Sequence, residues 1–210
     1  MIAGGYLHRD QCPICSAPLS ASIPAVRSRP AAEALPFGTH GRFLAGYTNR
    51  RVIFTYHRCR ECGGLYCPVY FTPEQIHGLH SHEDENMAEV PRLVREATQK
   101  AYFEILRRHA PLEGEYLEIG PDIGLFAGTC ADHGRFTRFH LFEPNREVHP
   151  AVTARLAGHD VKISAAPYYA GLLPKADIST AILVHVLDHL VDPADSLRAS
   201  TTIWRPEAWS

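Results

Sequence analysis

Residues 115–128, EYLEIGPDIGLFAG, predict how the C-terminal part of this chain folds. An apolar run at 116–119 ends at Gly120, and Gly124 and Gly128 follow at intervals of four residues. The pattern indicates a strand, a tight turn and the start of a helix, as at the beginning of nucleotide-binding α/β domains. Asp122, however, stands where a phosphate-cradling loop would have glycine, and its carboxylate would repel a pyrophosphate.

The segments around this stretch continue an alternation of strands and helices. We expect strands at 115–119, 136–142, 160–164 and 178–184, and helices at about 125–133, at about 148–157 and from 193 onward. This alternation predicts an α/β fold, a Rossmann-like parallel sheet that is incomplete, with about four strands. Residues 87–110 predict a long amphipathic helix, whose apolar positions are Val90, Leu93, Val94, Ala97, Ala101 and Ile105.

Length and composition are those of a globular protein with one ordinary domain and a smaller one. The 210 residues are 45% hydrophobic and 21% charged, and the net charge is −2. That balance gives no footprint for nucleic acid or an acidic membrane. No run approaches the 18 apolar residues of a membrane span, and the N-terminus lacks a signal-peptide pattern, so we expect a cytoplasmic protein.

Two C-x2-C pairs, Cys12 with Cys15 and Cys59 with Cys62, are separated by 43 residues. Each pair can place two thiolates on one metal ion, and together they predict a tetrahedral four-sulfur zinc site. We assign it to a zinc-ribbon-like β module at residues 1–83. A closed site of this kind has no open coordination position, so the zinc would hold the fold and perform no chemistry.

Other interpretations of the cysteines remain open from the sequence. Cys67 could be a bystander or could replace a ligand, and His8 and His57 could also compete. The thiols could instead be buried without metal. The gap between the pairs is longer than in compact ribbons, which indicates an insertion, and β-rich runs such as residues 51–56 lie in it.

The glycine spacing distinguishes between cofactors. A nicotinamide fingerprint, G-x-G-x-x-G, does not fit glycines at 120, 124 and 128. S-adenosylmethionine carries an ammonium and a sulfonium, which Glu118 and Asp122 would attract. Glu143 follows Gly120 by 23 positions, at the end of the second strand, where a carboxylate accepts hydrogen bonds from both ribose hydroxyls. Alone, Glu143 could equally be a solvated carboxylate at a strand end.

Three segments carry a family resemblance: EIGPDIG at 118–124, LFEP at 141–144 and HVLDHLVDP at 185–193. From about residue 84 onward the chain resembles class I S-adenosylmethionine-dependent methyltransferases. The resemblance implies that the loop residues Gly120, Asp122 and Gly124 line the methionine and ribose, and that Glu143 and Pro144 hold the ribose. It also implies that His185 borders the methyl-donor pocket and that Ala165 or Ala166 lies at the edge of the adenine, although the usual Asp is missing there.

The zinc module placed before such a domain, with YHRCRECGGLY at 56–66, is similar to sugar C-methyltransferases and their zinc-ribbon relatives. In that group a histidine at the place of His189 is implicated in proton transfer, so His189 is the candidate general base. His185 and His189 could also be a structural pair at a strand-to-helix corner. We expect His77, His80 and His82 to lie in a solvated polar loop.

The C-terminal tail does not resemble the continuation of a seven-stranded methyltransferase sheet. With G/C-ending codons, residues 203–210 read in a shifted frame become Leu-Ala-Pro-Gly-Gly-Leu-Val, which is the turn the family would have there. We therefore expect a truncated domain at 84–210, with a frameshift after about Arg198. Its fourth strand would be an exposed apolar edge through which the chain could self-associate.

The sequence thus predicts a methyltransferase that uses S-adenosylmethionine and a structural Zn²⁺ and acts on a small molecule such as a sugar nucleotide. Truncation would lower its activity. The alternative is a non-catalytic zinc-ribbon interaction protein with a degenerate α/β scaffold. We expect no membrane partner, and the near-neutral charge disfavours nucleic acid.

Overall fold

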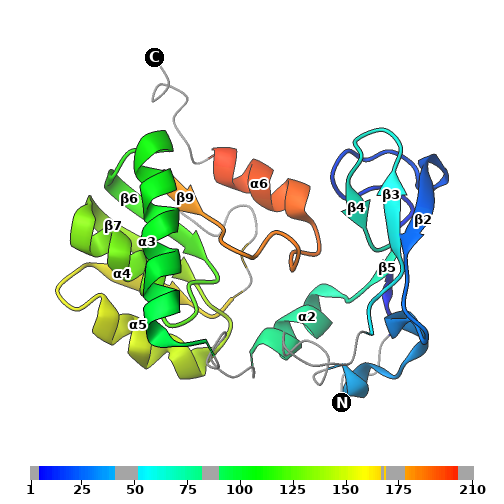
Figure 1. The fold of residues 1–210 in the computed structure, drawn as a ribbon, viewed down its shortest axis with the longest axis horizontal. Helices are drawn as coiled ribbons and strands as arrows, with labels where there is room; N and C mark the ends of the chain where they lie inside the picture. The colour runs from blue at the N-terminus through cyan, green and yellow to red at the C-terminus, as the bar shows by residue number, and fades with distance from the viewer. Residues whose placement is uncertain (1–4, 41–51, 82–89, 167, 169–177, 203–210) are drawn as a thin grey trace. The chain divides into compact units, whose positions relative to one another are not determined.

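The computed structural model describes residues 5–40, 52–81, 90–166, 168 and 178–202 (Figure 1). The chain forms two compact units, one of Met1–Leu79 with Leu190–Ala194 and one of His80–His189 with Asp195–Ser210. The boundary expected between residues 83 and 84 lies outside the described residues. So does the tail at 203–210, for which the frameshift was inferred.

The second unit contains a parallel sheet of β6 (Glu113–Ile119), β7 (Arg135–Phe142), β8 (Val161–Ser164) and β9 (Ile178–Ile182). Its strand order is β8-β7-β6-β9, which confirms the predicted Rossmann-like α/β class. β9 ends two residues before the expected Val184. Within the described residues β9 pairs only with β6, so it forms an edge of this sheet.

Helices α3 (Arg92–His109), α4 (Leu125–His133) and α5 (His149–Arg155) pack on one face of this sheet. Side chains alternate along β6, so Tyr116 lies in the core beneath these helices and Leu117 lies in the core of the opposite face. Both are fully buried. α4 has the expected bounds, and α6 (Pro193–Thr202) begins where predicted. α5 begins one residue later than expected, after a 3-10 turn at Arg146–Val148, and ends two residues earlier.

The predicted core face of α3 is wrong. Leu93, Val94 and Ile105 are 80%, 52% and 58% exposed, whereas Phe103 is buried in the core. Tyr102 and Leu106 pack beside Phe103. The large aromatic residues, and not the more numerous small apolar ones, thus determine which face of the helix contacts the sheet.

The described residues of the first unit form two small antiparallel sheets and the helix α2 (Pro73–His80). β1 (Leu7–His8) pairs with β5 (Val69–Tyr70), and the other sheet has the order β2 (Ser22–Val26), β3 (Tyr56–Cys59), β4 (Leu65–Tyr66). Three 3-10 turns lie at Leu19–Ala21, Ala32–Ala34 and Phe37–Thr39. In the described residues no helix is both long and apolar enough to cross a membrane.

Among the described residues 52–56 of the β-rich run noted in the sequence, only Tyr56 belongs to a strand, since β3 begins there. The reason lies in the backbone of Ile53, whose N–H donates to Ser28 Oγ at 2.9 Å and whose carbonyl accepts from the Ala32 amide at 3.0 Å. These groups therefore bond to a loop and a turn instead of to a neighbouring strand. Phe54 meanwhile packs edge-on against Phe71 in the core of this unit.

Candidate functional site

The carboxyl ends of β6 and β9 meet where the order of the sheet reverses. The chain proceeds from β6 outward to β7 and β8 and then returns to β9 on the other side of β6. In open α/β sheets such a switch point forms the crevice in which ligands bind. The residues expected to hold a cofactor follow these strands, and they are Gly120, Asp122, Gly124, Glu143, Pro144 and His185.

The loop after β6 has three residues in the left-handed region. Gly120, Asp122 and Gly124 have φ angles of 70°, 52° and 76°. A Cβ at Gly120 would lie 2.8 Å from Val186 Cγ2, and one at Gly124 would lie 3.3 Å from Val152 Cα. These two positions therefore require glycine for close approach as well as for conformation. Aspartate is one of the few other residues that visit this region, which explains why the loop accepts it.

Glu143, which follows β7, is fixed by two backbone amides. Its Oε2 accepts from the Asp122 amide at 3.0 Å, and its Oε1 accepts from the Asn145 amide at 2.9 Å. The residue is 7% exposed. Burial raises the pKa of the carboxyl, and the two amide hydrogen bonds oppose that rise. Because the main chain of Asp122 binds Glu143, the loop after β6 and the end of β7 form one structure.

Glu118 lies within β6, on the face of the sheet that α4 covers. It is 2% exposed, and its Oε2 accepts a hydrogen bond from Tyr116 Oη at 2.8 Å. Burial raises its pKa to about 7, and the nearby Glu143 carboxylate contributes to that rise. Its role in attracting a cationic cofactor stays a prediction.

His185 lies just beyond β9 and has a φ angle of 55°, which is uncommon for a residue other than glycine. Its Nε2 lies 2.8 Å from the hydroxyl of Tyr102 on α3. The next residue, Val186, is the one that contacts Gly120. The turn after β9 is thus held from two sides. No sequence pattern indicates the contact with Tyr102, because 83 residues separate the two partners.

His189, the candidate base, stacks on His80 with ring centroids 4.9 Å apart and planes 8° apart. Its Nε2 lies 3.6 Å from Asp188 Oδ2, and its side chain is 48% exposed. His80 also acts electrostatically on Glu143, favouring the ionised form of that carboxyl. The expectation that His77 and His80 lie in a polar loop is wrong, since both belong to α2, and His82 lies outside the described residues.

Ala165 and Ala166 follow β8 at the same edge of the sheet. The Ala166 amide donates to Ser164 Oγ at 3.2 Å, and the Glu143 amide donates to the Ser164 carbonyl at 2.9 Å. The end of β8 is therefore tied to the residue expected to hold the ribose. The place of Ala165 beside an adenine stays a prediction.

The four cysteines of the two C-x2-C pairs form one cluster in the first unit, and all their sulfurs lie within 4.8 Å of one another. Sγ of Cys12 lies 3.8 Å from that of Cys62, and Sγ of Cys15 lies 3.7 Å from that of Cys59. A tetrahedron with Zn–S bonds of 2.3 Å has an S···S edge of about 3.8 Å. The sulfurs are thus spaced as zinc requires.

The surroundings favour a thiolate at Cys59, whereas burial raises the pKa of Cys12 and the pKa of Cys15 is raised to about 12. The pKa of Cys59 is lowered to about 7, chiefly because the Cys62 amide donates a hydrogen bond to its sulfur. A Cβ at Gly64 would lie 2.5 Å from Ile14 Cδ1, the end of an exposed side chain that can move aside, and 3.3 Å from Cys62 Sγ. Cys67 is buried outside the cluster, and among the described residues His8 and His57 are not part of it either.

Comparison with known proteins gives a family match and a structural match. Residues 89–210, more than half of the chain, match the model of a family described as a methyltransferase domain. Among solved structures, a Leishmania major protein described as a SAM-dependent methyltransferase is 14% identical, with 66% of this chain and 67% of that chain covered and a TM-score of 0.44. Curated protein sequences gave no significant match.

Proposed function

From the premise that the chain belongs to the family of methyltransferase domains, we propose that it transfers a methyl group from S-adenosylmethionine to a small-molecule acceptor. The observation that carries the proposal is Glu143, fixed by two amides at the switch point of the sheet. Each carboxylate oxygen has two lone pairs and gives one of them to an amide. One lone pair on each oxygen is left for a ribose hydroxyl.

The electrostatics of the loop also support a cationic ligand. Three acidic residues lie near the carboxyl ends of β6 and β7, namely Glu118 in β6, Asp122 in the loop after it and Glu143 directly after β7. A pyrophosphate would be repelled there, whereas an ammonium or a sulfonium would be attracted. Because Glu143 is buried, its attraction acts through a medium of lower dielectric constant than water. Glu118, with a pKa of about 7, contributes to the attraction only in its ionised form.

S-adenosylmethionine supplies an electrophilic methyl group on a sulfonium, and the protein's task is alignment and exclusion of water. Gly120 and Gly124 let the loop approach closely, and His185, tied to Tyr102, fixes the turn that faces it. His189, next to Asp188 and stacked on His80, is our candidate to accept a proton when the acceptor must lose one.

We assign a structural Zn²⁺ to Cys12, Cys15, Cys59 and Cys62, because the spacing of their sulfurs fits a tetrahedral site. We assign the acceptor to small molecules such as sugar nucleotides and not to nucleic acid, since the chain has a net charge of −2. The same charge and the reduced thiols agree with a cytoplasmic location.

Calorimetric titration of the zinc-loaded chain with S-adenosylmethionine tests the cofactor assignment. We expect saturable binding, weakened about tenfold or more by Glu143→Ala, because a charge-assisted contact to the ribose is lost. Glu147→Ala removes an exposed carboxylate four residues further on and should leave the affinity unchanged. Absence of binding by a folded sample would overturn the proposal and favour a non-catalytic zinc-ribbon interaction protein.

A further inference from the structure

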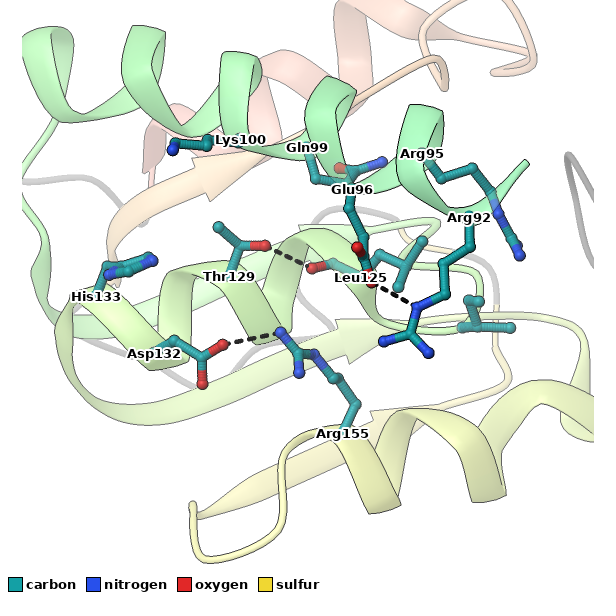
Figure 2. A pocket seen from close by; sticks show the side chains of 11 residues that line it. Arg92, Arg95, Glu96, Gln99, Lys100, Leu125, Thr129, Asp132, His133 and Arg155 are labelled. Carbon is teal, nitrogen blue, oxygen red and sulfur yellow. Dashed lines mark hydrogen bonds and ion pairs between the residues drawn. The ribbon is translucent and has the colours of Figure 1, made fainter. Parts of the chain in front are cut away.

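Helices α3, α4 and α5 line a solvent-open cavity of about 490 Å³ on their side of the second unit (Figure 2). Its charged lining comprises four cationic side chains and two carboxylates, namely Arg92, Arg95, Lys100, Arg155, Glu96 and Asp132. The cavity therefore concentrates positive charge in a chain whose net charge is −2. Nothing in the proposed methyl transfer uses this charge.

The ion pairs of Arg92 and Arg155 leave most of the donors of these two side chains available. Arg92 Nε donates to Glu96 at 2.6 Å, and Arg155 Nη2 donates to Asp132 at 2.8 Å. A guanidinium has five N–H donors in a planar fork, so each arginine uses one of its five in these pairs. Lys100 has no ion pair within 4.0 Å among the described residues. Such forks suit the oxygens of a phosphate, which they can contact through two hydrogen bonds at once.

Arg155 reaches the cavity because α4 has a glycine in its path. A Cβ at Gly128 would lie 2.1 Å from Arg155 Nε and 2.6 Å from its Cγ. A glycine inside a helix costs roughly 1 kcal/mol relative to alanine. The absence of a side chain at Gly128 leaves room for Arg155 to reach Asp132 on α4, the ion pair that Figure 2 shows.

The cavity also adjoins the loop after β6. Ile123 and Leu125, on either side of Gly124, contribute to its lining. A ligand in the cavity would therefore contact the opposite side of the segment that carries Asp122.

We propose that this cavity binds a small phosphate-bearing metabolite, whose phosphate oxygens are held by Arg92, Lys100 and Arg155. A phosphate carries up to two negative charges, which matches the excess of two cations over carboxylates in the lining. The site is distinct from the one proposed for S-adenosylmethionine, and its ligand is recognised by charge opposite to that of the sulfonium cofactor.

Inorganic pyrophosphate is the probe for this site, titrated calorimetrically into the zinc-loaded full chain without S-adenosylmethionine. We expect saturable binding that Lys100→Gln weakens about tenfold, as loss of one charge-assisted contact predicts. Gly128→Ala should weaken it similarly, because the new methyl group displaces Arg155. Arg135→Gln is the matched control, since Arg135 is 84% exposed, pairs with Glu113 and does not line the cavity.

The outcomes separate clearly. The proposal is wrong if pyrophosphate does not saturate the chain below a concentration on the order of 10 mM. It is also wrong unless both cavity variants weaken binding more than Arg135→Gln does. Circular dichroism checks that each variant is folded, and Arg155→Gln replaces Gly128→Ala should the latter not fold. Because no cofactor is present, failure here would leave the methyltransferase proposal untouched.

Discussion

Replacing Glu118 by glutamine should raise the stability of the second unit relative to the wild type progressively as the pH increases from about 4.5 to about 7. Burial raises the pKa of Glu118 from 4.5 to about 7. Between these two values the folded chain holds a proton that the unfolded chain releases, so the wild type loses stability as pH rises. One pKa unit corresponds to about 1.4 kcal/mol, which gives a loss of about 3 kcal/mol between pH 4.5 and pH 7.

Glutamine mimics the protonated carboxyl and does not titrate. Its carbonyl can still accept the hydrogen bond from Tyr116 Oη, while its extra N–H group adds a cost that does not vary with pH. The prediction therefore concerns the change in the stability difference with pH and not its absolute value.

Urea denaturation of both proteins, followed by circular dichroism from pH 5 to pH 8, measures this change. The difference in unfolding free energy between variant and wild type should rise with pH and level off above about pH 7. Tyr116→Phe is a second test, because it removes the hydrogen bond that lowers the pKa of Glu118 and should shift the levelling to higher pH. A difference that stays flat across the range would refute the reasoning.

Three further predictions concern other parts of the chain. Burial lowers the pKa of His40 below 6.5, so in acid the folded chain binds fewer protons than the unfolded chain. The free energy of unfolding should therefore fall as the pH drops below 6.5. The His40→Phe variant should lack this part of the pH–stability curve. Cys59→Ser should abolish stoichiometric zinc in atomic absorption and unfold the first unit, whereas retained zinc would contradict the four-sulfur site. Gly124→Ala should lower the free energy of unfolding by about 1–2 kcal/mol because of its left-handed φ, and further because the new Cβ would contact Val152. Gly158 has a φ of 91° but open space around it, so thermal denaturation should show a smaller loss of stability for Gly158→Ala.

The order of strands and helices in the second unit could be predicted because its signals are local. Each strand is a short apolar run that ends at glycine or a polar residue, and α4 lies between Gly124 and Gly134. The orientation of α3 could not be predicted in this way. Its small apolar residues repeat at helical spacing, yet the aromatic ring of Phe103 makes the contact with the core.

For the candidate sites, too, the residues with local sequence signals could be predicted and the contacts between distant segments could not. The four cysteines come in pairs whose spacing determines their geometry, and Glu143 follows its strand at a fixed distance from Gly120. The contacts of Tyr102 with His185 and of His80 with His189 depend on how α3, α2 and the turn after β9 are arranged in space. No local pattern records that arrangement, so sequence reasoning assigned His80 to a loop.

The acidic residue in the glycine loop has a structural explanation as well as a functional one. A loop that cradles phosphate presents its amides to the ligand, but here the amide of Asp122 is already bonded to the Glu143 carboxylate. That amide is therefore not available to an anion, and the carboxylate it holds repels one. A glycine at position 122 would adopt the same φ at less cost, yet it would leave this arrangement of amide and carboxylate unchanged. The proposed preference for a cation thus rests on the pairing of the two loops, and the Asp122 side chain adds to it.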